Sequence, residues 1–253
     1  MKYTVLSLFP EIIDTFFATS IMAKAISRGI VAYRSINIRD YAQDKHKTCD
    51  DAPYGGGAGM LMLPEPLSRA LSAADAGMPG KRAIYLSPSG KMFTQELAKE
   101  LARERELILI CGRYEGIDQR VIDLYVDDEI SVGDYVLSSG ETAALVLIDA
   151  SYRLLDGVIS GESLNEESFS GGLLEYPQYT RPEIYDSIQG EMRVPEILLS
   201  GHHENIRRWR LKKRVEKTLA NRPELLRKGM EKGLFDYETR KIIGELSGVT
   251  EEL

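Results

Sequence analysis

Three glycine-bearing loops, each following a β-rich run of residues, carry the side chains best suited to chemistry. The first spans Ser87 to Lys91, the second sets Arg, Tyr and Glu between Gly112 and Gly116, and the third runs through 131–141. In α/β folds the ligand site lies at the carboxyl ends of parallel strands. We therefore expect the three loops to converge on one pocket. The alternatives are plain turns and, for the second loop, a connection to a helix capped by Asp118.

A fourth glycine segment runs from Tyr54 to Met60 with the sequence YGGGAGM. It lacks the G-x-G-x-x-G fingerprint, because Met60 occupies the third glycine position, and it lacks the Gly-Lys-Ser/Thr ending of a P-loop. So many glycines favour a close approach of backbone to a flat group, such as a base or a cofactor. A flexible surface loop is the alternative.

Basic residues gather in one stretch of an acidic chain. The protein has 32 basic and 39 acidic residues, yet residues 206–222 hold eight basic residues and one acidic. On a helix, Arg207, Arg210 and Arg214 share a face and predict a stripe that contacts phosphates. A solvated charged surface is the alternative. Trp209, the only tryptophan, is either a core residue or a platform for a base.

The elements that must position these residues alternate between strands and helices. Apolar patterning predicts strands at 3–8, 35–38, 83–86, 107–111 and 129–132, with helices at about 12–28, 65–76, 94–104, 118–124 and 141–149. This alternation indicates an α/β fold with a mostly parallel sheet. Residues 161–194 show neither helical nor strand periodicity of apolar residues, which indicates an interdomain linker or lid. Helices near 201–220, 222–229 and 236–246 indicate a small all-α C-terminal domain, so we expect domains at 1–160 and 195–253 joined by that linker.

Composition narrows the function classes. With 253 residues, 43% hydrophobic and 28% charged, the chain is expected to fold around a real core rather than remain disordered. Two cysteines and three histidines argue against a disulfide framework and against a zinc site. The apolar runs are shorter than a membrane span, and the first residues do not resemble a signal peptide. We expect a cytoplasmic protein that does not bind a membrane.

Six motifs, taken in order, carry a family resemblance: LFP at 8–10, YGGGAGM at 54–60, GRYEGID at 112–118, VGDYVL at 132–137, LEYPQYTRP at 174–182, and LLSG at 198–201 with IRRWR at 206–210. Together they resemble the bacterial tRNA (guanine-N1)-methyltransferases. The resemblance implies a SPOUT-class fold with a deep trefoil knot, and a homodimer with composite active sites. It also implies methyl transfer from S-adenosylmethionine to N1 of guanosine 37 in tRNA.

The resemblance also implies roles for individual residues. Glu167 stands where the family usually has an aspartate and is expected to be the general base, and Arg153 is expected to stabilise charge on guanine O6. Glu115 is expected to assist the cofactor or a magnesium ion. The expected cofactor-binding residues are Tyr85, Leu86, Ser87, Pro88, Gly112, Tyr114, Val132, Gly133, Asp134, Tyr135, Val136, Leu137 and Gly140. The expected tRNA-binding residues are Gly55, Gly56, Gly57, Gly59, Tyr179, Arg181, Arg207, Arg210 and Arg214.

Two other functions fit part of the pattern. A non-catalytic RNA-binding protein would explain the basic stretch but not three glycine loops after three strands. A SPOUT relative that methylates another base or a ribose would share the cofactor loops.

Overall fold

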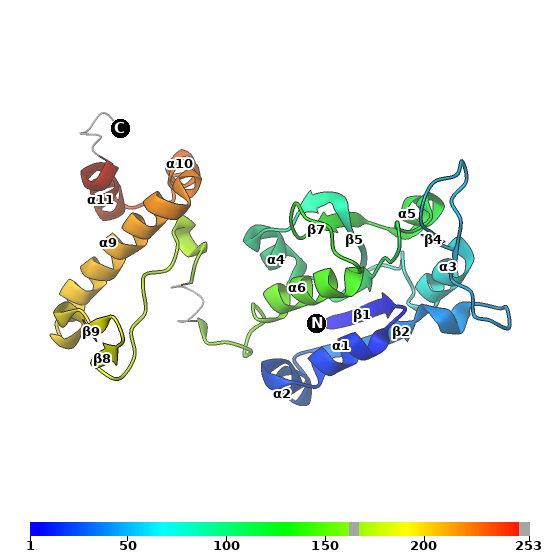
Figure 1. Ribbon diagram of the computed structural model, residues 1–253, viewed down its shortest axis with the longest axis horizontal. Coiled ribbons are helices and arrows are strands. Elements are labelled where there is room, and N and C mark those ends of the chain that lie inside the picture. The colour runs from blue at the N-terminus through cyan, green and yellow to red at the C-terminus, as the bar shows by residue number, and fades with distance from the viewer. Residues whose placement is uncertain (162–166, 248–253) are drawn as a thin grey trace. The chain divides into compact units, whose positions relative to one another are not determined.

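The computed structural model describes residues 1–161 and 167–247, and the chain divides into two compact units, Met1–Ser160 and Gly161–Leu253. Each unit has its own hydrophobic core. Figure 1 shows the elements of both units along the chain.

The first unit is built on a five-stranded sheet in the order β2-β1-β6-β5-β7, and every pairing in it is parallel. The central strand β6 is buried along its whole length, as expected for a strand covered on both faces. The predicted parallel α/β arrangement is confirmed. The strands are β1 (Lys2–Ser7), β2 (Ala32–Asn37), β5 (Lys81–Met92), β6 (Glu106–Ile110) and β7 (Asp128–Ser131).

Helices cover both faces of this sheet (Figure 1). Because side chains alternate along a strand, Leu107 and Leu109 face one core, and Ile108 and Ile110 face the other. Four helices pack on the first face: α1 (Pro10–Phe17), α2 (Ser20–Ser27), α4 (Gln95–Leu101) and α6 (Gly140–Tyr152). The second face carries η1 (Ile38–Tyr41), α3 (Pro64–Ala73) and α5 (Gln119–Tyr125).

Strand β5 is longer than the predicted strand at 83–86. It continues to Met92, and both Leu86 and Lys91 pair with Ile130 of β7, so residues 87–90 bulge out of the ladder. A Cβ on Gly90 would collide with the backbone of residues 129 and 130, which is why glycine is required there. The bulge carries the first glycine loop.

Two features of the first unit differ from the prediction. The single helix predicted at 12–28 is two helices, α1 and α2, separated at Ala18 and Thr19. The strands β3 (Asp50–Asp51) and β4 (Leu61–Met62), which we did not predict, pair antiparallel and close the glycine segment at 54–60.

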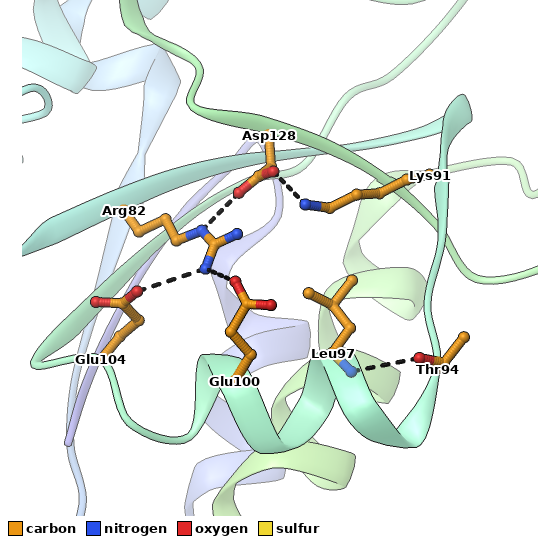
Figure 2. Close-up of polar contacts among 7 residues, drawn as sticks. All are labelled: Arg82, Lys91, Thr94, Leu97, Glu100, Glu104 and Asp128. Carbon is orange, nitrogen blue, oxygen red and sulfur yellow. Dashed lines mark hydrogen bonds and ion pairs between the residues drawn. The ribbon is translucent and has the colours of Figure 1, made fainter. Parts of the chain in front are cut away.

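An ion-pair network stabilises the edge of the sheet where β5 meets β7 and α4 (Figure 2). Arg82 lies 2.5 Å from Asp128 and 2.6 Å from Glu100, and Lys91 also contacts Asp128. Burial would raise the pKa of Asp128, but the hydrogen bonds from Arg82 and Lys91 lower it below its ordinary value.

The second unit packs helices around a small core of Leu173, Val215, Leu226 and Phe235. A hairpin of β8 (Ile184–Ser187) and β9 (Gly190–Arg193) lies in the stretch where no regular structure was expected. The expectation of a separate all-α domain is not confirmed, because this hairpin belongs to the same unit as the helices. The remaining elements are η2 (Ser170–Gly172), α8 (Glu196–Leu199), α9 (His203–Asn221), α10 (Pro223–Glu231) and α11 (Tyr237–Ser247).

Among the described residues, no helix combines the length and the apolar character that crossing a membrane requires.

Candidate active site

The glycine loop that bulges out of β5 and the glycine loops that follow β6 and β7 line one cavity of about 190 Å³ in the first unit. Residues 85–88, 112–116 and most of 130–140 form its walls. This convergence is what the sequence predicts for loops at the carboxyl ends of parallel strands. Every residue expected to bind the cofactor lines the cavity except Asp134, which is exposed on the same loop.

Close backbone packing joins the second and third loops. The amide of Gly140 donates to the carbonyl oxygen of Gly112 at 2.9 Å. A Cβ on Gly140 would lie 2.7 Å from the Cα of Cys111 and 2.7 Å from the amide nitrogen of Gly112. Glycine at position 140 therefore allows helix α6 to begin directly against the end of β6.

The aromatic ring of Tyr85 fixes the first loop against the second. Tyr85 is 7% exposed, and a Cβ on Gly112 would lie 2.9 Å from its ring. Burial raises the pKa of Tyr85, with a further contribution from the charge of Glu129. The phenol therefore stays protonated at neutral pH and acts as a wall of the cavity.

Arg113 is a cavity residue that the sequence analysis did not single out. Its guanidinium lies over the ring of Phe9, 4.5 Å from the centroid, and donates to the carbonyl oxygen of Ser138 at 3.1 Å. Arg113 and Ser138 both line the cavity, so this contact connects the second loop to the third. The only sequence signal was their position inside the glycine motifs.

A buried carboxylate holds Phe9 in place. Ser7 donates to Glu141 at 2.6 Å and accepts the amide hydrogen of Phe9 at 2.8 Å. Glu141 is fully buried, and its Oε2 has no hydrogen-bond partner among the described residues. Burial raises the pKa of the neighbouring Cys111 well above its ordinary value, and the charge of Glu141 adds to this effect. The Cys111 thiol is therefore buried and protonated at neutral pH.

The glycine segment at 54–60 reaches the cavity at one point. The amide of Glu115 donates to the carbonyl oxygen of Met60 at 3.0 Å, and the Glu115 side chain lies against Gly59 so closely that a Cβ there would collide with it. Gly59 also has a φ of +87°, which glycine adopts without strain. A Cβ at Gly55, Gly56 or Gly57 would meet no atom within 4 Å.

The rim of the cavity exposes apolar side chains. Tyr114 is 48% exposed, Tyr135 55% and Val136 87%. Burial raises the pKa of Tyr114, as does the nearby charge of Asp50. Tyr114 also adopts a φ of +57°, which is uncommon outside glycine and presents its ring at the rim.

The two residues expected to carry out catalysis lie in different units. Arg153 follows the end of α6 in the first unit, and Glu167 lies near the start of the second unit, where its carbonyl oxygen accepts the amide hydrogen of Ser170 at 3.1 Å. Both side chains are half-buried.

The arginines of the predicted phosphate stripe lie on α9, as expected, but each has contacts within its own unit. Arg207 forms ion pairs with Glu204 at 3.0 Å and with Glu238 at 2.6 Å. Arg210 lies over the ring of Tyr176, 4.7 Å from its centroid. Arg214 donates to backbone carbonyl oxygens of residues 170 and 174.

Tyr179 and Arg181 also belong to the second unit, and both are exposed. They line a second cavity, of about 500 Å³, together with Trp209 and Arg210. Trp209 is therefore neither a core residue nor a fully exposed platform, but a half-buried wall residue.

The described residues include no group of three or more His, Cys, Asp and Glu side chains that could hold a metal ion. Glu115 is therefore a single carboxylate at the edge of the first cavity, without the partners of a metal centre.

Comparison with known proteins gives a consistent result. Residues 1–228 match the family described as tRNA (Guanine-1)-methyltransferase TrmD. A protein of Treponema denticola named tRNA (guanine-N(1)-)-methyltransferase is 64% identical over 245 residues, which cover 97% of this chain and 98% of that protein. Proteins with the same name from Treponema pallidum and Borreliella burgdorferi are 57% and 58% identical, and cover 97% and 98% of this chain and 96% and 98% of their own lengths. The chain belongs to the tRNA (guanine-1)-methyltransferase family.

Proposed function

We propose that this protein transfers a methyl group from S-adenosylmethionine to N1 of guanosine 37 in tRNA. The observation that supports the proposal best is the cavity lined by residues 85–88, 112–116 and most of 130–140, because two of its three loops carry the motifs GRYEGID and VGDYVL that resemble the family. A non-catalytic RNA-binding protein would have no need of such a cavity.

The residues of this cavity fit S-adenosylmethionine. Leu86 and Ile130 are buried and give the cavity an apolar floor suited to an adenine ring, and Ala143 extends it. The glycines of the surrounding loops expose backbone amides and carbonyls, which can bind the polar edges of adenosine and of the methionine moiety. Bound S-adenosylmethionine supplies an electrophilic methyl group.

The side chains assigned to catalysis act on the guanine. N1 carries a proton at neutral pH, and that proton must leave as the methyl group arrives. We assign the proton to the carboxylate of Glu167, which keeps the charge of the usual aspartate on a side chain one methylene longer. Arg153 is assigned to stabilise the negative charge that develops on O6.

A homodimer and a trefoil knot are part of the proposal. The exposed apolar rim formed by Tyr114, Tyr135 and Val136 supports a covering surface at the cavity, which a second copy of the chain would supply.

The assigned tRNA contacts come from both units. They include the glycine segment, through Gly59 beside Glu115, and the residues Tyr179, Arg181, Arg207 and Arg210 of the second unit. Arg214, the third arginine of the predicted stripe, donates to two backbone carbonyl oxygens of its own unit, so we assign it to packing. We assign no magnesium site, because the described residues include no group of three or more side chains that could hold a metal ion.

Primer extension on an unmodified tRNA transcript tests the proposal. A methyl group on N1 prevents Watson–Crick pairing, so reverse transcription should stop at position 37 after incubation with protein and S-adenosylmethionine. A transcript with adenosine at position 37 is the control and should give no stop. A stop at another nucleotide would favour a SPOUT relative with a different target, and calorimetry without heat from S-adenosylmethionine would favour a pure RNA-binding protein.

A further inference from the structure

The second unit contains a cavity that plays no part in the methyl-transfer chemistry assigned above. Its volume is about 500 Å³, within the range of pockets that hold small organic groups. Its walls come from the 176–181 segment, from Glu183 and Val194 at the ends of the hairpin, and from helices α8 and α9.

Aromatic rings form two sides of this cavity. Tyr179 and Trp209 lie with their ring centroids 6.4 Å apart and their planes at 54°. Tyr176 is 7% exposed and lies beneath the guanidinium plane of Arg210. Tyr179 is 48% exposed, so one aromatic face remains available at the mouth of the cavity.

The polar groups of the cavity favour an anionic or hydrogen-bond-accepting ligand. The Nε of Arg210 is buried and has no hydrogen-bond partner among the described residues. Arg181 is exposed, and no hydrogen bond or ion pair joins it to another described residue. The described residues that line the cavity include one carboxylate, Glu183.

We propose that this cavity binds an unstacked nucleobase of the tRNA, separate from the methylated guanine. The base would stack on Tyr179, the Nε–H of Arg210 would donate to an acceptor atom of the base, and Arg181 would contact the adjoining phosphate. Proteins recognise single-stranded RNA in this way, by stacking bases on aromatic rings and arginine planes. The inference rests on the proposed function, which makes tRNA the substrate.

An apolar partner fits this cavity less well. A leucine or phenylalanine side chain from another protein would leave the buried Nε of Arg210 unpaired, and unpaired buried donors are costly. A nucleobase offers both an aromatic face, which can stack on Tyr179, and hydrogen-bond acceptors, which can accept from the Nε–H of Arg210.

The single tryptophan makes the proposal directly testable, because emission excited at the red edge of the indole absorption band, where tyrosine does not absorb, comes from Trp209 at the cavity wall. Titration with an unmodified tRNA transcript should quench this emission in a saturable way. A blunt RNA duplex should give little quenching, because its bases are paired and stacked. Equal quenching by the duplex would mean that the second unit binds phosphates only and would overturn the proposal.

Matched variants separate stacking from folding. Tyr179→Ala should abolish most of the quenching and weaken tRNA binding roughly 5-fold or more, and Tyr179→Phe, which keeps the ring, should retain both. Tyr185→Ala is the control, because Tyr185 is a 62% exposed ring in the hairpin that does not line the cavity. Calorimetric binding of S-adenosylmethionine should be unchanged in all three. Unchanged tRNA affinity and quenching in Tyr179→Ala would refute the proposal.

Two further outcomes are distinguishable. Weaker self-association of Tyr179→Ala than of the wild type, measured by light scattering without RNA, would indicate that a second copy of the chain fills the cavity, which also overturns the proposal. Methyl transfer by the wild-type protein, measured by primer extension, tests the proposed function independently. If methylation were normal and Trp209 emission did not change on addition of tRNA, the cavity proposal would be rejected and the proposed function would stand.

Discussion

Replacement of Gly140 by alanine should damage the cofactor cavity through one defined contact. The new Cβ would lie 2.7 Å from the Cα of Cys111 and from the amide nitrogen of Gly112, whereas ordinary van der Waals contact begins at 3.4 Å. Backbone at the end of β6 and helix α6 must therefore separate by about 0.7 Å. Because Cys111 is fully buried in the core, this movement cannot be confined to a flexible side chain.

The sign of the stability change follows from two opposing magnitudes. Overpacking of this kind costs about 1–3 kcal/mol. Alanine gains at most about 1 kcal/mol over glycine in a helix interior, and Gly140 is only the first residue of α6. We expect the free energy of unfolding to fall by about 1–2 kcal/mol. A displacement approaching 1 Å can cost about 10²-fold in activity, so kcat/KM should fall roughly 10- to 100-fold.

Urea unfolding and calorimetry with S-adenosylmethionine measure the two effects. Gly161→Ala is the control, because its added Cβ would meet no atom within 4 Å. If Gly140→Ala left the unfolding free energy unchanged and bound S-adenosylmethionine with wild-type affinity, the close approach of α6 to β6 would not be a constraint on the site, and our account of the cavity would be wrong.

Three other changes test separate parts of the protein. Asp128→Asn should lower the unfolding free energy by about 1–3 kcal/mol at pH 7. Because the folded pKa of Asp128 is depressed, its stabilisation is present above about pH 4 and is lost as the pH falls through that folded pKa, so thermal denaturation of variant and wild type should converge in acid. Glu167→Gln should slow single-turnover methyl transfer roughly 10²-fold with tRNA still bound. Its control is Glu166→Gln, at a position outside the described residues. A larger loss of activity in the control would place the base one residue earlier. Arg207→Glu should weaken tRNA binding and reduce its salt slope by about 1, whereas Arg214→Glu should chiefly lower the melting temperature; an unchanged slope for the first variant would remove Arg207 from the RNA contacts.

The middle of the sheet in the first unit was predictable because its strands β1 and β6 are buried. An apolar run such as residues 107–111 has only one favourable place, the centre of a covered parallel sheet. The hairpin of β8 and β9 gave no such signal, because all of its residues but Ser187 are exposed and its sequence does not alternate. Strand pairing there depends on backbone hydrogen bonds, which every sequence can form.

The position of the cavity was predictable from the sequence, but the contacts that form it were not. Glycines after three strands indicate where the chain must approach a ligand, and the loops do converge there. The role of Arg113 depends on its contact with Phe9. Phe9 follows β1 and is far from Arg113 in the sequence, so no local pattern could reveal this contact. Likewise, the side chain that lies against Gly59 is that of Glu115, which comes from a different loop.

Helix α9 shows why residue spacing alone could not identify the phosphate contacts. The spacing correctly places Arg207, Arg210 and Arg214 on one helix face, but it does not say what that face meets. Exposed ion pairs such as those of Arg207 are worth about 0–1 kcal/mol, so Arg207 can exchange a carboxylate for a phosphate at little cost. Arg214 donates to two backbone carbonyls that would lose these bonds, and Arg210 is committed to Tyr176. One apparently uniform stripe is therefore divided between RNA contact, a base-sized cavity and the packing of the unit itself.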